Sequence, residues 1–140
     1  QDVCMKNFPF LSPSQAMLLL RVAIAVMFMA HAITRIANGT IPRFAGFLED
    51  KGFMYGLAVV WAITVVEIVC GSLLIAGKYT RWAAAGLMVI CVGGIAIVHA
   101  AKGWFVGEHG AGGVEYSIVL FVACVVIAAS DRGRAATRLA

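Results

Sequence analysis

The chain of 140 residues is 62% hydrophobic and 13% charged, and its mean hydropathy is +0.95. Soluble globular domains carry about 25% charged residues, so this composition indicates a membrane protein. The net charge of +4 is spread over connections and the tail without a basic run, which argues against nucleic-acid binding and favours contact with anionic lipid headgroups. The four cysteines form no C-x-x-C pair, so the sequence indicates neither a dithiol redox centre nor a zinc site.

Four long apolar runs account for most of the chain, at residues 15–36, 55–77, 81–101 and 113–130. Each is close to the ~20 residues that a helix needs to cross ~30 Å of hydrocarbon. The short connections between them leave no room for a soluble domain, so residues 1–140 are predicted to form a single membrane domain. The predicted fold class is therefore an all-α integral membrane protein, an antiparallel bundle of four transmembrane helices.

The first connection, residues 37–54, is longer and predicts a short additional helix. Pro42 would stand in its first turn and Gly52 after its end. Phe44 and Phe47 would then share one face, as in a helix that lies in the membrane interface on the outer leaflet. The alternative is an ordered connector that packs against the bundle.

Basic residues are unevenly divided between the two sides of the predicted bundle. The side of the termini carries six: Lys6, Lys78, Arg81, Arg132, Arg134 and Arg138. The opposite side carries three, or four if Arg35 is counted: Arg43, Lys51 and Lys102. Because positively charged connections tend to stay inside, both termini are predicted to face the cytoplasm.

Ionisable residues inside or at the ends of the apolar runs are the candidates for function. Charges at bilayer depth are costly and normally face the bundle interior, where they find partners. Two of them, Arg21 in the first run and Glu67 in the second, are predicted to form a structural ion pair. Such a pair would fix the register of the helices without taking part in chemistry.

A second group converges in the outer half of the predicted bundle. His31 and His99 would lie ~24 Å and ~27 Å along their runs from the cytoplasmic side, and Arg35 follows His31 by one turn on the same face. The predicted pocket comprises His31, Arg35, His99 and Glu115, with Trp104 and Tyr116 at its mouth. We expect His31, His99 and Glu115 to be the catalytic groups, and the other three residues to bind substrate or quinone. The alternative is an interhelical hydrogen-bond network that only fixes packing.

These residues could also be considered as metal or haem ligands. Imidazole and carboxylate groups are competent ligands, and two histidines at one depth can hold a haem. No two histidines share a helix at ligand spacing, however. The sequence therefore does not predict a metal site or a covalently bound cofactor.

Taken in order, several short motifs resemble the DoxX family of small bacterial membrane proteins. They cover residues 18–131 and comprise Leu18-Leu-Leu-Arg21 with His31, Ile41-Pro-x-Phe44, Glu67-x-x-x-Gly71, His99 with Gly103-Trp-Phe105, and Gly113-x-Glu115-Tyr116. The sequence departs from the usual pattern of that family at two positions, with Ala32 in place of Gly and Arg35 in place of Lys. The resemblance implies a multi-pass protein of the bacterial cytoplasmic (inner) membrane. Relatives include the membrane subunit of thiosulfate:quinone oxidoreductase.

The resemblance and the polar pocket together suggest an integral subunit of a redox complex that binds quinone or a small anionic reductant. The chain has no cofactor motif of its own, so bound quinone or a further membrane or peripheral redox subunit would have to handle electrons. Whether the chain is itself an enzyme is left open, as is the alternative of a non-catalytic anchoring subunit. In that alternative the buried charges would only fix helix packing.

Overall fold

The computed structural model describes residues 10–107 and 112–139, with side chains up to residue 131; Lys6, which contributed to the predicted orientation, lies outside them. The described residues form five α-helices and no strand. The helices are α1 (Pro13–Ala37), α2 (Ile41–Asp50), α3 (Gly56–Ala76), α4 (Thr80–Gly94) and α5 (Glu115–Leu139). After Gly94 the fourth helix continues as η2 (Ile95–His99), a π-helix, and η3 (Ala100–Lys102), a 3-10 helix.

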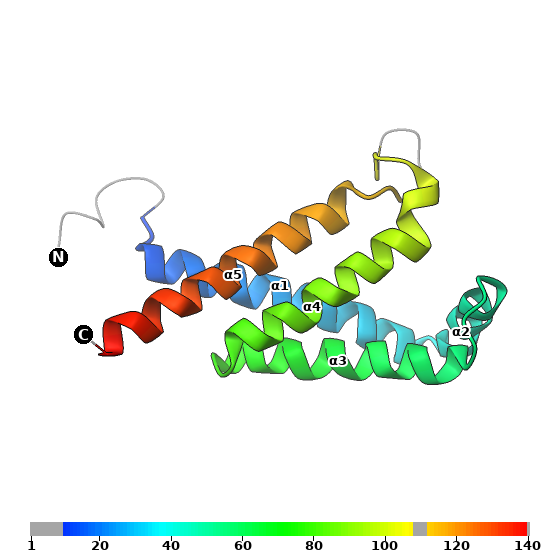
Figure 1. Ribbon diagram of the computed structural model, residues 1–140, viewed down its shortest axis with the longest axis horizontal. Helices are drawn as coiled ribbons and strands as arrows, with labels where there is room; N and C mark the ends of the chain where they lie inside the picture. Colours follow the sequence, from blue (N-terminus) through cyan, green and yellow to red (C-terminus); the bar gives the residue numbers. More distant parts are fainter. Residues whose placement is uncertain (1–9, 108–111, 140) are drawn as a thin grey trace.

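Four of the helices lie lengthwise beside one another and enclose the core (Figure 1). α1 packs against α3 and α5, and α4 also packs against α3 and α5. Both termini lie at one end of this bundle and α2 lies at the other (Figure 1). The core residues that the four helices share are mostly apolar and small to medium in size, among them Ala25, Phe28, Leu74, Leu87, Cys124 and Ile127.

Local signals in the sequence explain where these helices begin and end. Ser12 and Gln15 form a capping box at the start of α1, which satisfies backbone N–H groups of its first turn. Gly77 ends α3 with φ of +69°, a left-handed conformation that glycine adopts at little cost. Only residues 77–79 separate α3 from α4, so the two helices must return as antiparallel neighbours.

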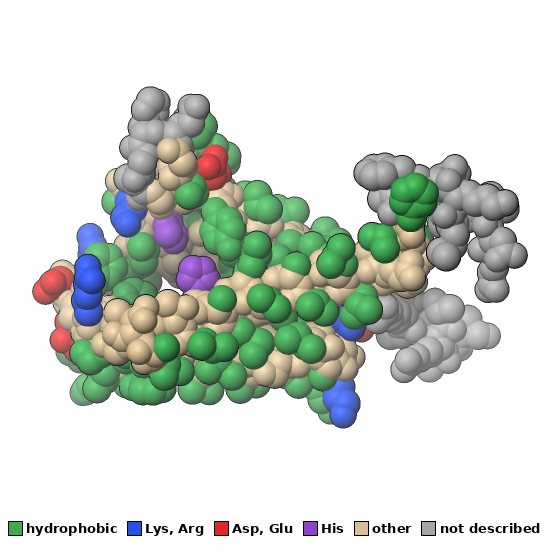
Figure 2. Space-filling model, turned by 180° about the vertical axis from the view of Figure 1, so that it is seen from behind, with side chains coloured by type: hydrophobic (Ala, Val, Ile, Leu, Met, Phe, Trp, Pro, Cys, Tyr) green, Lys and Arg blue, Asp and Glu red, His purple; other side chains and the backbone are tan. Residues whose placement is uncertain are grey.

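Three helices among the described residues are long and apolar enough to cross a membrane: Pro13–Ala37, Gly56–Ala76 and Thr80–Lys102. Apolar side chains cover much of the outer surface along the bundle (Figure 2), as expected where lipid replaces water. α5 is longer than the predicted run 113–130, because it continues through Asp131 and the basic residues after it. That α5 is a fourth span remains a prediction.

α2 packs against the first turn of α3. Ile41, Ala45 and Leu48 form a buried cluster with Val60. A side chain at Gly56 would collide with the backbone carbonyl of Ala45, so only glycine allows this approach. The structure therefore shows residues 41–50 as a helix that packs on the bundle. That this helix lies in a membrane interface stays a prediction.

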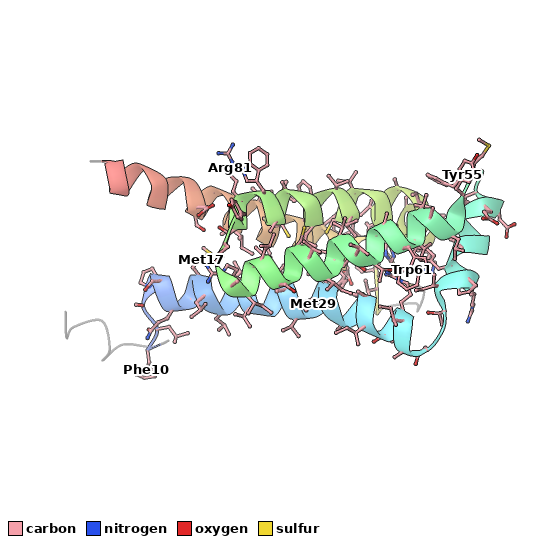
Figure 3. All side chains as sticks on the ribbon, turned by 90° about the horizontal axis from the view of Figure 1, so that it is seen from below. Phe10, Met17, Met29, Tyr55, Trp61 and Arg81 are labelled. Atoms are coloured by element: carbon pink, nitrogen blue, oxygen red, sulfur yellow. The ribbon has the colours of Figure 1, made fainter. Side chains whose placement is uncertain are left out.

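α1 and α3 lie side by side along the bundle (Figure 3), and close contacts between them fix their relative position along the helix axes. A Cβ on Gly71 would lie 2.5 Å from Cγ of Met29, and one on Gly77 would lie 3.2 Å from Nη2 of Arg21. Arg21 is therefore level with the C-terminal end of α3. The end of α1 that carries Arg35 is level with the middle of α3.

Candidate functional site

The most strongly linked polar group of the bundle is centred on Arg35. Its Nη1 donates to Oε2 of Glu67 at 3.0 Å and to Oγ1 of Thr64 at 2.7 Å. The Glu67 side chain is only 5% exposed and that of Arg35 is 14% exposed. The Thr64 hydroxyl in turn donates to the carbonyl of Val60 at 2.8 Å, and the Phe44 ring lies 5.4 Å from the guanidinium carbon. These contacts hold the guanidinium in one place.

This arrangement corrects the predicted ion pair between Arg21 and Glu67. Glu67 pairs with Arg35 instead, and Arg21 lies beside Gly77, ten residues or ~15 Å farther along α3. The reason is the register: α2 covers the first turn of α3, so the end of α1 packs farther along that helix. Nε of Arg21 is buried without a hydrogen-bond partner in the described part of the chain.

Two adjoining cavities lie beside Arg35 at the α2 end of the bundle. The inner one, of about 490 Å³, is lined by polar residues from four helices together with apolar side chains. Its polar lining comprises His31, Arg35, Glu67, His99, Tyr116 and Ser117. Nη2 and Nε of Arg35 make no hydrogen bond with the described residues, so three of its N–H donors remain available to a ligand.

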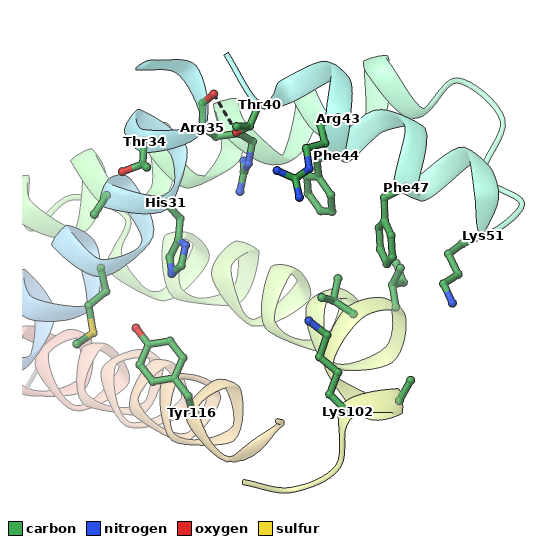
Figure 4. A pocket seen from close by; sticks show the side chains of 15 residues that line it. His31, Thr34, Arg35, Thr40, Arg43, Phe44, Phe47, Lys51, Lys102 and Tyr116 are labelled. Atoms are coloured by element: carbon green, nitrogen blue, oxygen red, sulfur yellow. Dashed lines mark hydrogen bonds between the residues drawn. The ribbon is translucent and has the colours of Figure 1, made fainter. Parts of the chain in front are cut away.

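The outer cavity, of about 960 Å³, opens between α1, α2, η3 and the start of α5 (Figure 4). His31 and Tyr116 project into it from α1 and α5. It shares six lining residues with the inner cavity: His31, Arg35, Phe44, Ile97, Val98 and Tyr116. From behind, histidine side chains lie at the edge of a hollow with Lys and Arg side chains beside it (Figure 2).

The His99 side chain, at the end of the π-helix, makes one side-chain hydrogen bond with the described residues. Its Nδ1 lies 2.7 Å from the carbonyl oxygen of Gly112. A carbonyl oxygen can only accept, so Nδ1 carries the proton, and Nε2 of the neutral ring is left as an acceptor. π-helical turns are rare in proteins, and many of those that do occur lie at functional sites. Here the π-helical turn ends at His99, which lines the inner cavity and contacts Gly112 in the connection between η3 and α5.

The predicted pocket residues are thus only partly brought together. His31, Arg35, His99 and Tyr116 share the inner cavity, whereas Glu115 and Trp104 do not line it. Oε1 of Glu115 accepts from the backbone N–H of Val106 at 2.9 Å, which ties the connection to the first turn of α5. The Trp104 side chain is exposed, and its backbone carbonyl accepts from the N–H of Glu115.

Several residues around the cavities were not predicted to line the pocket; Glu67 was predicted only as part of a structural ion pair. Glu67 lines the inner cavity, and Thr64 orients Arg35. The outer cavity is also lined by three basic side chains: Arg43 of α2, Lys51 directly after α2, and Lys102 of η3. The basic and aromatic residues Arg43, Phe44 and Phe47 of α2 were a usable signal, but only the packing of α2 on the bundle shows which side chains face the cavity.

A metal site is not indicated by the geometry of the described residues. Among them, no group of three or more His, Cys, Asp or Glu side chains is close enough to hold an ion. The cysteines described, Cys70, Cys91 and Cys124, are unpaired thiols within the bundle. The polar groups of the described residues that line the inner cavity are therefore a guanidinium, two imidazoles, two hydroxyls and one carboxylate, which accepts hydrogen bonds.

The scan against protein-family models matches the DoxX family over residues 16–100. The comparisons with curated proteins and with solved structures found no match. The matched segment contains Arg35, Glu67 and both histidines of the inner cavity, and it confirms the resemblance noted in the sequence. Because the match covers more than half of the 140 residues, the chain belongs to the DoxX family.

Proposed function

We propose that this protein is an integral membrane subunit of a redox complex, and that its inner cavity binds the ring of a quinone or a small anionic reductant. The observation that carries the proposal is the anchored guanidinium of Arg35, with unused N–H donors beside His31, His99 and Tyr116. Guanidinium donors suit both a quinone carbonyl and an anion. The largely apolar lining of the cavity suits a ring.

The chemistry follows from the groups around the cavity. Reduction of a quinone takes two electrons and two protons, and oxidation of a quinol returns them. His99, with Nε2 free to accept, would take a proton from a quinol hydroxyl, and Arg35 would stabilise developing negative charge on the opposite oxygen. The electrons would come from or pass to a further redox subunit, because the chain supplies no redox group of its own.

The most direct test is a titration with a short-chain quinone of the full chain in nanodiscs. We expect His31→Ala to weaken binding about tenfold or more, the effect of losing roughly 1.4 kcal/mol of hydrogen bonding. The matched control is Ser72→Ala, because the Ser72 hydroxyl donates only to the carbonyl of Ile68 in its own helix. Wild-type affinity in the His31 variant would count against the proposal.

An anchoring subunit without chemistry is the alternative function. In that case Arg35 and Glu67 would serve only to join α1 to α3, and no quinone would bind saturably to the wild-type chain. Saturable binding that is lost in the His31→Ala variant would exclude this reading. Binding that is equally weak in every variant would favour it.

We also propose that the protein spans the bacterial inner membrane four times with both termini in the cytoplasm. A single cysteine introduced at Lys78, with the native cysteines replaced, should then be labelled by a membrane-impermeant maleimide only after permeabilisation. A cysteine at Lys51, at the α2 end of the bundle, should be labelled in intact cells. The reverse pattern would show that the orientation is wrong.

A further inference from the structure

The outer cavity differs from the inner one in the sign and distribution of its charge. Its fifteen described lining residues include four cationic side chains and no Asp or Glu. The cationic residues come from three places along the chain: Arg35 from α1, Arg43 and Lys51 from α2 and its C-cap, and Lys102 from η3. The cavity is therefore lined by like charges that the fold brings together from separate parts of the chain.

Most of these charges have no counter-ion among residues 10–107 and 112–131. Arg35 pairs with Glu67, but Arg43 and Lys102 make no ion pair or hydrogen bond with the described residues. The Lys51 ammonium lies 5.8 Å from the centre of the Phe47 ring. The nearby carboxylate of Glu49 is engaged elsewhere, since its Oε1 accepts from the N–H of Gly56 at 3.1 Å. We define the side chains of Arg43, Lys51 and Lys102 as the basic mouth.

Much of the remaining lining of the outer cavity is apolar, although His31, Thr34, Thr40 and Tyr116 also line it. Met27, Phe47 and Ile97 line it, and Phe44 and Val98 continue from it into the inner cavity. Figure 4 shows the Arg43 and Lys102 side chains on either side of the space between α2 and η3. A ligand there would meet cationic groups at the end of the bundle and apolar groups toward its interior.

We propose that the basic mouth binds the phosphate-type head of an amphiphilic anion whose apolar body occupies the outer cavity. Clustered Lys and Arg side chains at the end of membrane helices attract anionic headgroups, and repulsion among neighbouring cations falls when an anion is placed between them. A bilayer phospholipid and a free phosphate present the same head chemistry. The apolar lining favours the phospholipid, and the two can be distinguished by experiment.

The test uses native mass spectrometry of the full chain, released from neutral detergent doped with equal amounts of phosphatidic acid and diacylglycerol of the same acyl chains. We expect selective retention of phosphatidic acid. The double variant Arg43→Gln/Lys102→Gln should lower that retention at least fivefold. The matched control, Lys78→Gln/Arg81→Gln, removes two basic side chains near the α3–α4 turn at the opposite end and should change it less than twofold.

Other outcomes would overturn the inference. Equal retention of diacylglycerol would show that the anionic head is not recognised, and equal losses in both double variants would show only general attraction to basic residues. Displacement of the lipid by a tenfold excess of inorganic phosphate would show that no apolar body is required. The proposal goes beyond the quinone site: His99 lines the inner cavity and not the outer one, so quinone titration of His99→Asn tests that site, and lipid retention in the Arg43→Gln/Lys102→Gln variant tests the basic mouth.

Discussion

Replacing Glu67 by leucine should lower the free energy of unfolding by ~3–5 kcal/mol, the usual cost of breaking a buried ion pair from one side. The variant leaves the guanidinium of Arg35 in a largely buried position with only the Thr64 hydroxyl as a hydrogen-bond partner. Unfolding in detergent, followed by circular dichroism, measures the effect. A change below ~1 kcal/mol would mean that Arg35 readily finds another partner or moves to solvent.

A double-mutant cycle identifies the partner of Glu67. Combined with Arg35→Met, Glu67→Leu should cost much less than the sum of the two single changes, because contacting residues couple by about 0.5–3 kcal/mol. Arg21→Met is the matched control: it removes the same group from the same helix, but Arg21 lies beside Gly77. Its effect should add to that of Glu67→Leu within ~0.5 kcal/mol. Coupling to Arg21 instead would restore the pairing predicted from the sequence.

Replacing His99 should separate its structural contact from its chemistry. In His99→Asn the side-chain amide N–H can take the place of Nδ1 and donate to the carbonyl of Gly112, whereas His99→Ala loses that bond. We expect the alanine variant to lose about 1 kcal/mol of stability and the asparagine variant to stay near wild type. Both lack Nε2, so both should lose quinone binding about tenfold or more if that nitrogen meets the ligand.

The two readouts, thermal unfolding and quinone titration in nanodiscs, can be made on the same preparations. Wild-type quinone affinity in His99→Asn together with weakened affinity in His99→Ala would show that only the contact with Gly112 matters. His99 would then be a positioning residue that shapes the last connection. It would take no part in proton transfer.

The positions of the helices could be predicted because apolar run length and end signals are local. The predicted run 55–77 forms α3 at Gly56–Ala76. Gly77 ends this helix, and no residue within it interrupts the backbone hydrogen bonds. The extra helix after the first run was also predicted from Pro42 and Gly52. The π-helical turn at the end of the third run was not predicted, because no side chain there marks the change from α-helical hydrogen bonding.

The grouping of His31 with Arg35 also followed from the sequence, because residues one turn apart share a helix face whatever surrounds them. The pairing of Glu67 with Arg35 could not be predicted from the sequence. Similar depth favours Arg21 over Arg35 only if helices α1 and α3 end at the same level. They do not, because α2 packs over the first turn of α3. Because of that packing, the end of α1 lies beside the middle of α3, where Arg35 meets Glu67. The same packing places Arg43 of α2 and its C-cap Lys51 at the outer cavity.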